Sequence, residues 1–212
     1  VYYVLLNIPI QTVLAMIIAV MMSRLTKSII IRSIIILPWL MPGVVVGLLW
    51  LWLLDPTLGI VNVALRELGI GTIPFLNLPK YAMPSIAMIN IWQYVGYTAL
   101  LLFAGLQSIP GSVYEAASID GASEAQMFWK VTVPLSKAGI IAGSMLVFIP
   151  CVGEFVIPEL LGGPETLMIG RVLWDEFFSN NDWPMASSVA VVMVLLIIVP
   201  LAIFNKYQAE AQ

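Results

Sequence analysis

The sequence predicts an all-α protein that crosses a membrane several times. Apolar residues make up 61% of the chain and charged residues only 10%, and the mean hydropathy is +1.01. A water-soluble domain of this composition would have too little polar surface to cover itself. The apolar residues also fall into runs of about 20, the length that a helix needs to cross the hydrocarbon core of a bilayer. We therefore expect a polytopic membrane protein whose main solvent is lipid.

Five apolar runs, separated by polar and helix-breaking residues, are long enough to span the bilayer. The predicted spans are 1–22, 29–54, 82–108, 133–157 and 185–204, and together they form a single transmembrane domain over 1–212. Prolines inside these runs each remove a backbone donor that a neighbouring helix or a water-lined cavity must replace. They are Pro9, Pro38, Pro42, Pro150 and Pro200. Tryptophans near the span ends, Trp39 among them, are typical of anchoring at headgroup depth.

The basic residues predict the orientation of the spans. The connection 23–28 carries Arg24 and Lys27, which the positive-inside rule assigns to the cytoplasm. With the sides alternating, six basic residues fall inside and three outside: Arg24, Lys27, Arg32, Lys130, Lys137 and Lys206, against Arg66, Lys80 and Arg171. The first residue then lies outside, so we expect a further span to precede it in the complete protein.

The composition argues against an enzyme. The chain has no histidine, which removes the commonest general base and metal ligand. Its one cysteine, Cys151, lies in an apolar run and can form no intrachain disulfide. The Gly-x-x-x-x-Gly-Lys-Ser/Thr phosphate loop is also missing from the sequence. We therefore expect no catalytic residue, metal or cofactor in this chain.

The segment 109–132 is the only long connection on the predicted cytoplasmic side. With the two residues after it, the segment reads IPGSVYEAASIDGASEAQMFWKVTVP. We predict a short helix that is capped by Ser112, runs to Ile119 and is broken by Gly121, followed by a second short helix over 123–129. An ordinary pair of interfacial helices would show the same amphipathic pattern. The choice between these interpretations depends on a more specific spacing.

That spacing resembles the EAA loop of permease subunits of ABC importers. In this family a Glu-Ala-Ala triplet precedes a glycine and, later, a hydrophobic-x-hydrophobic-Pro sequence. Val131 and Val133 stand here where isoleucine and leucine are usual. The resemblance assigns ATPase docking, and a required turn at the glycine, to this loop: Glu115, Ala116, Ala117, Asp120, Gly121 and Pro134.

The resemblance extends over essentially the whole chain and implies an architecture and partners. The expected fold is the five-helix core of a type I ABC importer (MetI-like), with a cytoplasmic coupling helix between its third and fourth spans. The expected location is a bacterial-type cytoplasmic (inner) membrane. The implied partners are two ATPase subunits that bind ATP and Mg²⁺, a second and different permease subunit, an extracytoplasmic substrate-binding protein and membrane lipid, with no nucleic acid.

The C-terminal half predicts a polyamine as the solute. Residues 143–184 resemble spermidine/putrescine permeases, and Glu154 lies within a span, where a charge is costly and is a candidate for function. Phe155 could offer a cation–π contact to an ammonium group. The predicted outer surface carries five more acidic than basic residues, which would attract cations. The acids are Asp55, Glu67, Glu154, Glu159, Glu165, Asp175, Glu176 and Asp182.

The N-terminal half predicts a different solute. Residues 37–62 and 106–123 resemble sugar and glycerol-phosphate permeases. In this alternative, polar and aromatic side chains of the third span bind hydroxyl groups and stack on a sugar ring: Asn90, Gln93, Tyr94 and Tyr97. Three of them, Asn90, Tyr94 and Tyr97, share one helical face, which packing between helices would also explain. The acidic exterior and the polyamine-like segment favour the first solute.

Two other classes of transport protein fit the sequence less well. A channel needs no docking loop, and a secondary transporter is expected to show internal repeats with ion-coupling residues in mid-span. The sequence contains the docking-loop spacing, and it shows neither internal repeats nor ion-coupling residues in mid-span. The sequence thus favours a permease subunit that obtains its energy from a separate ATPase.

Overall fold

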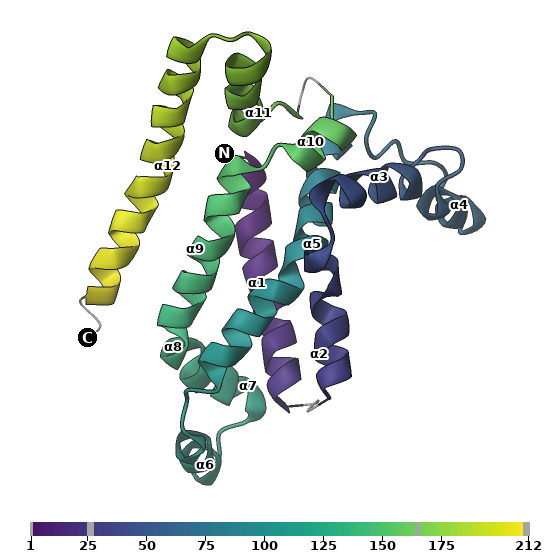
Figure 1. Cartoon of the computed structure of the whole chain (residues 1–212). Helices are drawn as coiled ribbons and strands as arrows, with labels where there is room; N and C mark the ends of the chain where they lie inside the picture. The colour runs from purple at the N-terminus through teal and green to yellow at the C-terminus, as the bar shows by residue number, and fades with distance from the viewer. Residues whose placement is uncertain (1, 25–27, 164–165, 210–212) are drawn as a thin grey trace.

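The computed structural model describes residues 2–24, 28–163 and 166–209, with side chains described for all of these except Arg24 and 203–209. Lys27 and Glu165, which entered the charge counts above, lie outside the described residues. The described chain is helical and contains no strand (Figure 1). Its elements are α1 (Tyr2–Arg24), α2 (Ile29–Ile36), the 3-10 helix η1 (Leu37–Leu40), α3 (Gly43–Leu53), α4 (Ile60–Glu67), α5 (Pro79–Leu106), α6 (Gly111–Ile119), α7 (Glu124–Met127), the π-helix η2 (Phe128–Thr132), α8 (Val133–Leu135), α9 (Lys137–Gly153), α10 (Val156–Leu161), α11 (Ile169–Trp174), the π-helix η4 (Asp175–Ser179) and α12 (Trp183–Ala209).

Helices lie over all five predicted spans. Three of them are long and apolar enough to cross a membrane by themselves, over Tyr2–Ser23, Pro79–Leu106 and Trp183–Ala202. Two further spans are possible if each of two bent helix pairs counts as one. The all-α, multi-pass prediction is confirmed, while the exact spans and the single-domain assignment stay predictions.

The predicted span 29–54 is not one continuous helix. Its two arms, Ile29–Leu40 and Gly43–Leu53, meet at 93°, and α3 leaves the bundle sideways (Figure 1). Met41 and Pro42 between the arms have extended backbones, with ψ of 133° and 139°. A proline disfavours helical backbone at the residue before it and offers no donor itself, so the Met41–Pro42 step ends the first arm.

The predicted span 133–157 is also interrupted. The segment Glu124–Leu135 joins α9 at an angle of 69°, and α9 ends at Gly153 rather than at residue 157. Glu154 is extended, with φ −64° and ψ 130°, and α10 begins at Val156. The Pro150 and Gly153 pair thus precedes an unwound turn, and Glu154 lies between two helices instead of inside one.

The bundle is built around α5, which packs along α1 and also touches α2, α9 and α10. One glycine allows α5 to approach α2 closely, because a side chain at Gly96 of α5 would overlap the carbonyl oxygen of Ile35 at the end of α2. Two clusters of buried apolar side chains fill the interior. The first includes Tyr3, Val46, Leu54, Ile86, Ile89, Cys151 and Ile157, and the second Ala15, Ala19, Met22, Ala99, Leu102 and Phe103.

The connections gather at two ends of the bundle. The end of α1, the start of α2 and the helix α6 lie at one end, while α3, α4, α10 and α11 lie at the other (Figure 1). This agrees with placing both the 23–28 connection and the 109–132 loop on one side of the membrane. Which side is cytoplasmic stays a prediction.

Candidate solute path and coupling loop

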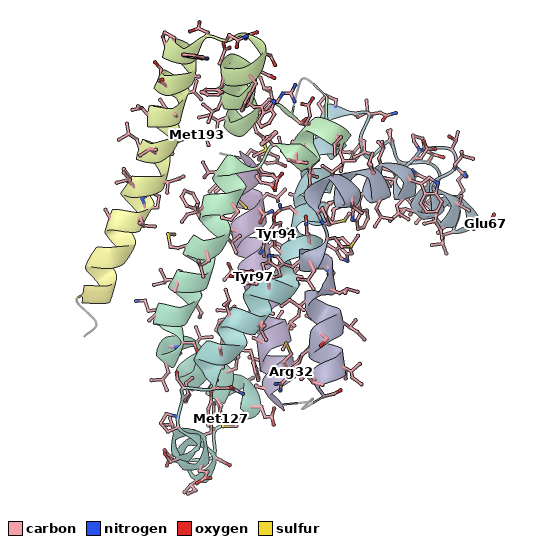
Figure 2. All side chains as sticks on the ribbon, viewed as in Figure 1. Arg32, Glu67, Tyr94, Tyr97, Met127 and Met193 are labelled. Carbon is pink, nitrogen blue, oxygen red and sulfur yellow. The ribbon has the colours of Figure 1, made fainter. Side chains whose placement is uncertain are left out.

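A cavity of about 280 Å³ lies beside α5, between this helix and α9. Three predicted residues, Asn90, Tyr94 and Tyr97, line it together, as their helical spacing requires. Both tyrosines are half-buried, and Figure 2 labels them along α5. The remaining lining residues are Trp39, Thr98, Leu146, Val147, Pro150 and Cys151. The lining therefore offers amide, hydroxyl and aromatic groups, and it includes no charged side chain.

Trp39 is a cavity residue that the sequence interpretation placed at headgroup depth. Its ring stacks on Tyr97 with centroids 4.5 Å apart and planes 9° from parallel. It reaches this position because it belongs to η1, the short turn just before the bend at Pro42. Flat, parallel aromatic faces with polar groups beside them suit a ring that is apolar on its faces and hydroxylated at its edge.

Buried polar contacts join α1 to the helices around the cavity. Asn7 Nδ2 donates to Asn90 Oδ1 at 2.9 Å, and Gln11 Nε2 donates to Thr98 Oγ1 at 2.9 Å. Both α1 side chains are fully buried. The sequence interpretation missed them, although two amides spaced i and i+4 within an apolar run are a signal for a polar helix face.

Glu154 touches the cavity region without lining the cavity. Its Oε2 accepts from Asn90 Nδ2 at 3.5 Å, while its Oε1 accepts from the backbone N–H groups of Val156 and Ile157 at 3.1 and 3.3 Å. These two N–H groups belong to the first turn of α10, where no intrahelical acceptor is present. Glu154 therefore caps α10, and a carboxylate is stabilised there by the positive end of the helix.

The other two predicted path residues lie elsewhere. Gln93 is buried, and its Nε2 donates to the backbone oxygen of Met41 at 3.0 Å, across from the bend in the second span. Phe155 stacks on Trp174 with centroids 5.3 Å apart and lines a different hollow next to Arg171. The structure thus gathers three of the six residues around the cavity, brings Glu154 to its edge and separates Gln93 and Phe155.

Most of the predicted outer acids already have partners within the chain. Six of the eight accept hydrogen bonds or ion pairs: Asp55, Glu154, Glu159, Asp175, Glu176 and Asp182. Arg171 alone joins two of them, contacting Glu159 at 2.9 Å and Asp175 at 2.8 Å. The bonds from the backbone of Leu58 and from Thr57 hold the pKa of Asp55 below its usual value. These acids therefore form turns, caps and ion pairs.

The first helix of the predicted coupling loop is α6. Gly121 ends it with φ +76°, a conformation that glycine adopts without steric cost. The N–H of Gly121 bonds the oxygen of Ser118 and the N–H of Ala122 bonds that of Ala117, each at 3.0 Å, which is a Schellman motif. The predicted cap is wrong, because Ser112 lies inside the helix and Pro110 occupies the N-cap position without a side-chain bond.

The second helix of the loop is shorter than predicted. Ser123 caps α7 through a capping box with Gln126, and the regular helix ends at Met127. The chain then widens into η2, and Pro134 follows in α8. In the loop, Glu115, Ala116, Asp120 and Gly121 are exposed and Ala117 is half-buried. An open face is therefore available on α6, next to a groove of about 1000 Å³ that Glu115 also lines.

Comparison with known proteins identifies the family of this chain. Residues 11–210 match the family described as binding-protein-dependent transport system inner membrane component. A curated relative, the sulfoquinovosyl glycerol transport system permease protein SmoG of Agrobacterium fabrum, is 33% identical over 82% of this chain and 58% of its own length. The spermidine/putrescine permease protein PotB of Haemophilus influenzae is 33% identical over 72% of the chain and 52% of its length.

Other relatives are named mostly as sugar permeases, for diacetylchitobiose, trehalose and maltose, xylose and arabinose, and glucose. The chain spans 58%, 64% and 50% of the length of the first three curated relatives.

The fold itself is found in a solved transporter. The crystal structure of a bacterial alginate ABC transporter, in complex with an alginate pentasaccharide-bound periplasmic protein, contains a chain that matches with a TM-score of 0.84. The match covers 97% of this chain and 76% of that one at 21% identity. With the family match over almost the whole sequence, these findings confirm the family resemblance, while the docking role of the loop stays a prediction. The chain belongs to the family of inner membrane components of binding-protein-dependent transport systems.

Proposed function

We propose that this chain is a transmembrane permease subunit of an ATP-driven importer and that it carries a polyhydroxylated solute of the sugar or glycerol-phosphate type. The observation that carries the proposal is the cavity beside α5, whose uncharged lining favours a neutral sugar over an anionic glycerol phosphate. Tyr94 offers a hydroxyl group there, beside the Asn90 amide and the Thr98 hydroxyl that also bond α1, and the Trp39–Tyr97 stack offers an apolar face. Such a combination binds hydroxyl groups through hydrogen bonds and the face of a sugar ring through apolar contact. The names of most relatives point the same way.

A polyamine fits these observations less well, and the preference drawn from the sequence alone changes accordingly. A solute with two or more ammonium groups needs carboxylates or bare aromatic faces along its path. The carboxylate nearest to the cavity, Glu154, already caps α10 with one oxygen. Two of the outer acids, Glu159 and Asp175, form ion pairs with Arg171, and only one relative reported above is named for polyamines.

The proposal includes partners that supply the energy and the solute. Two ATPase subunits would bind ATP and Mg²⁺, and one of them would dock on the exposed face of α6, where Glu115 and Ala116 are accessible. A second permease subunit would complete the path, and an extracytoplasmic binding protein would deliver the solute. In support, the alginate transporter of the same fold is bound to a periplasmic protein.

The solute is tested on the cognate binding protein, identified by genetic neighbourhood or co-purification. Its thermal stability is measured with sugars, glycerol phosphates, putrescine and spermidine, because a ligand raises the melting temperature of the protein that binds it. We expect a sugar or a glycerol phosphate to raise the melting temperature and the polyamines to leave it unchanged. Stabilisation by putrescine or spermidine alone would overturn the solute assignment, and the absence of any associated ATPase would overturn the importer.

A further inference from the structure

The helix α6 stands apart from the rest of the bundle. It lies beyond the ends of α5 and α1 (Figure 1), with the groove of about 1000 Å³ between it and these helices. Among the described helices, none packs extensively against α6. A force on α6 therefore reaches the bundle through its two chain connections and through whatever side chains cross the groove.

One side chain of α6 makes a polar contact across this gap. The hydroxyl of Tyr114 lies 3.1 Å from Oγ1 of Thr132 in η2, and it is the only side-chain hydrogen bond from α6 to another helix in the described part of the chain. Thr132 is buried, with 3% of its surface exposed. Its hydroxyl also lies within 3.4 Å of the Met127 oxygen, to which it can donate.

Thr132 also bonds Ser136, the residue just before α9. Its backbone oxygen accepts both the Ser136 hydroxyl at 2.6 Å and the Ser136 N–H at 2.9 Å. Ser136 is the residue at which the segment Glu124–Leu135 meets α9 at 69°. The π-helix before it is a widened turn, a rare form of helix that is frequent at functional sites. Thr132 is the last residue of this widened turn, and it contacts both Ser136 at the bend and Tyr114 on α6.

At its far end, α9 reaches the candidate solute path. It contributes Leu146, Val147, Pro150 and Cys151 to the cavity wall and ends at Gly153, just before Glu154. A rotation at the Ser136 bend would therefore move this wall relative to Asn90 on α5.

We propose that Tyr114 and Thr132 are a positioning pair that transmits movement of α6 to α9, and so couples ATPase closure to the opening of the cavity. The inference rests on the proposed function, because an ATPase must move α6. The pair differs from the docking residues, since Thr132 is buried and cannot touch a partner. We therefore expect that loss of either hydroxyl uncouples transport from ATP hydrolysis.

The test uses the complete transporter in proteoliposomes, with its ATPase, second permease and solute-loaded binding protein. Solute uptake and ATP hydrolysis are measured together for Tyr114→Phe and Thr132→Val, each of which removes a hydroxyl with little change in shape. A net hydrogen bond changes an equilibrium by roughly fivefold, so we expect solute transported per ATP to fall about fivefold in either variant. The double variant should be no worse than the single ones, because both remove the same contact.

Two controls separate this role from a merely structural one. Thr132→Ser keeps the hydroxyl and should keep the transport ratio, and Tyr81→Phe makes the same chemical change at the opposite end of α5 and should leave it unchanged. A wild-type ratio in both Tyr114→Phe and Thr132→Val would overturn the inference. So would a parallel fall of uptake and hydrolysis, which indicates lost docking or folding. A wild-type complex without ATP-driven uptake would instead refute the proposed function, and the pair's role with it.

Discussion

The two longest helices, α5 and α12, are both apolar enough to span a membrane, yet they have opposite surroundings. In its most apolar window, α5 has 61% of its residues buried and α12 only 6%. The polar side chains of α5 reach other elements, as Asn90 and Thr98 do with α1 and Gln93 with Met41. On α12, Ser187 and Ser188 bond the backbone of their own helix.

This difference distinguishes the spans that line the cavity from the spans that face outward. A polar side chain facing lipid must find its partner within its own helix, whereas one facing protein can join two helices and line a path. The cross-helix bonds of α5 therefore mark the face that packs on protein and lines the cavity, and the bonds of α12 within its own helix accompany an outward face. Four predictions test this contrast, in order of decreasing effect.

The largest effect is expected from the glycines of α5. Gly96→Ala places a methyl group against the carbonyl oxygen of Ile35, whereas Gly105→Ala meets nothing within 4 Å. Overpacking of this kind costs about 1–3 kcal/mol, while alanine in an open helical position is better than glycine by up to about 1 kcal/mol. We expect a lower melting temperature of the purified protein for Gly96→Ala and an equal or higher one for Gly105→Ala. Equal losses in both would contradict the close approach of α5 and α2.

The next effect concerns the polar partners of α5. Asn90→Leu leaves the Asn7 amide without its acceptor and removes a donor from Glu154. An unsatisfied buried amide costs about 1–3 kcal/mol, so we expect a measurable fall in thermal stability and a loss of solute uptake. The matched change on α12, Ser188→Ala, removes a bond to the Pro184 oxygen and should alter stability by less than about 0.5 kcal/mol. A larger loss from Ser188→Ala than from Asn90→Leu would reverse the contrast.

A double-mutant cycle isolates one cross-helix bond. Gln11→Leu and Thr98→Val each remove one partner of the 2.9 Å contact between α1 and α5. Cross-helix bonds in membranes have coupling energies of about 0.6 kcal/mol, up to about 1.7 kcal/mol. Denaturation of the single and double variants should give a coupling in this range. Strict additivity would mean that the two side chains act independently.

The smallest effect is expected on the exposed face of α12. Leu195 is 56% exposed, so Leu195→Ala creates no internal cavity and should change the melting temperature in lipid nanodiscs by the equivalent of less than about 0.5 kcal/mol. A loss of several kcal/mol in the assembled transporter would instead show that a second permease subunit covers this face.

Much of the helical fold could be predicted from the sequence, because hydropathy and helical spacing depend on residues that are close together in the chain. Hydropathy located the long helices, and the spacing of Asn90, Tyr94 and Tyr97 placed them on one face before the cavity was known. The positive φ of Gly121 at the end of α6 likewise follows from a short-range glycine signal.

The remaining features depend on contacts between distant parts of the chain. Asn7 and Asn90 are 83 residues apart, and a single sequence does not say which helices pair. Prolines marked the bend in the second span, but its direction depends on α3 packing against α10, where Gly47 lies against Leu160. Trp39 lines the cavity from η1, the short 3-10 helix that precedes that bend.

The most direct test of the solute path uses the protein's own single cysteine, Cys151, which lines the cavity but has only 2% of its surface exposed, so that labelling requires the cavity to open. In the assembled transporter, labelling of Cys151 by a small methanethiosulfonate reagent is followed by mass spectrometry during ATP turnover, with sugars, glycerol phosphates or polyamines present. We predict that the transported sugar or glycerol phosphate slows labelling and that putrescine and spermidine do not. Protection by polyamines alone, or labelling that no transported solute slows, would contradict the assignment of this cavity as the path of a polyhydroxylated solute.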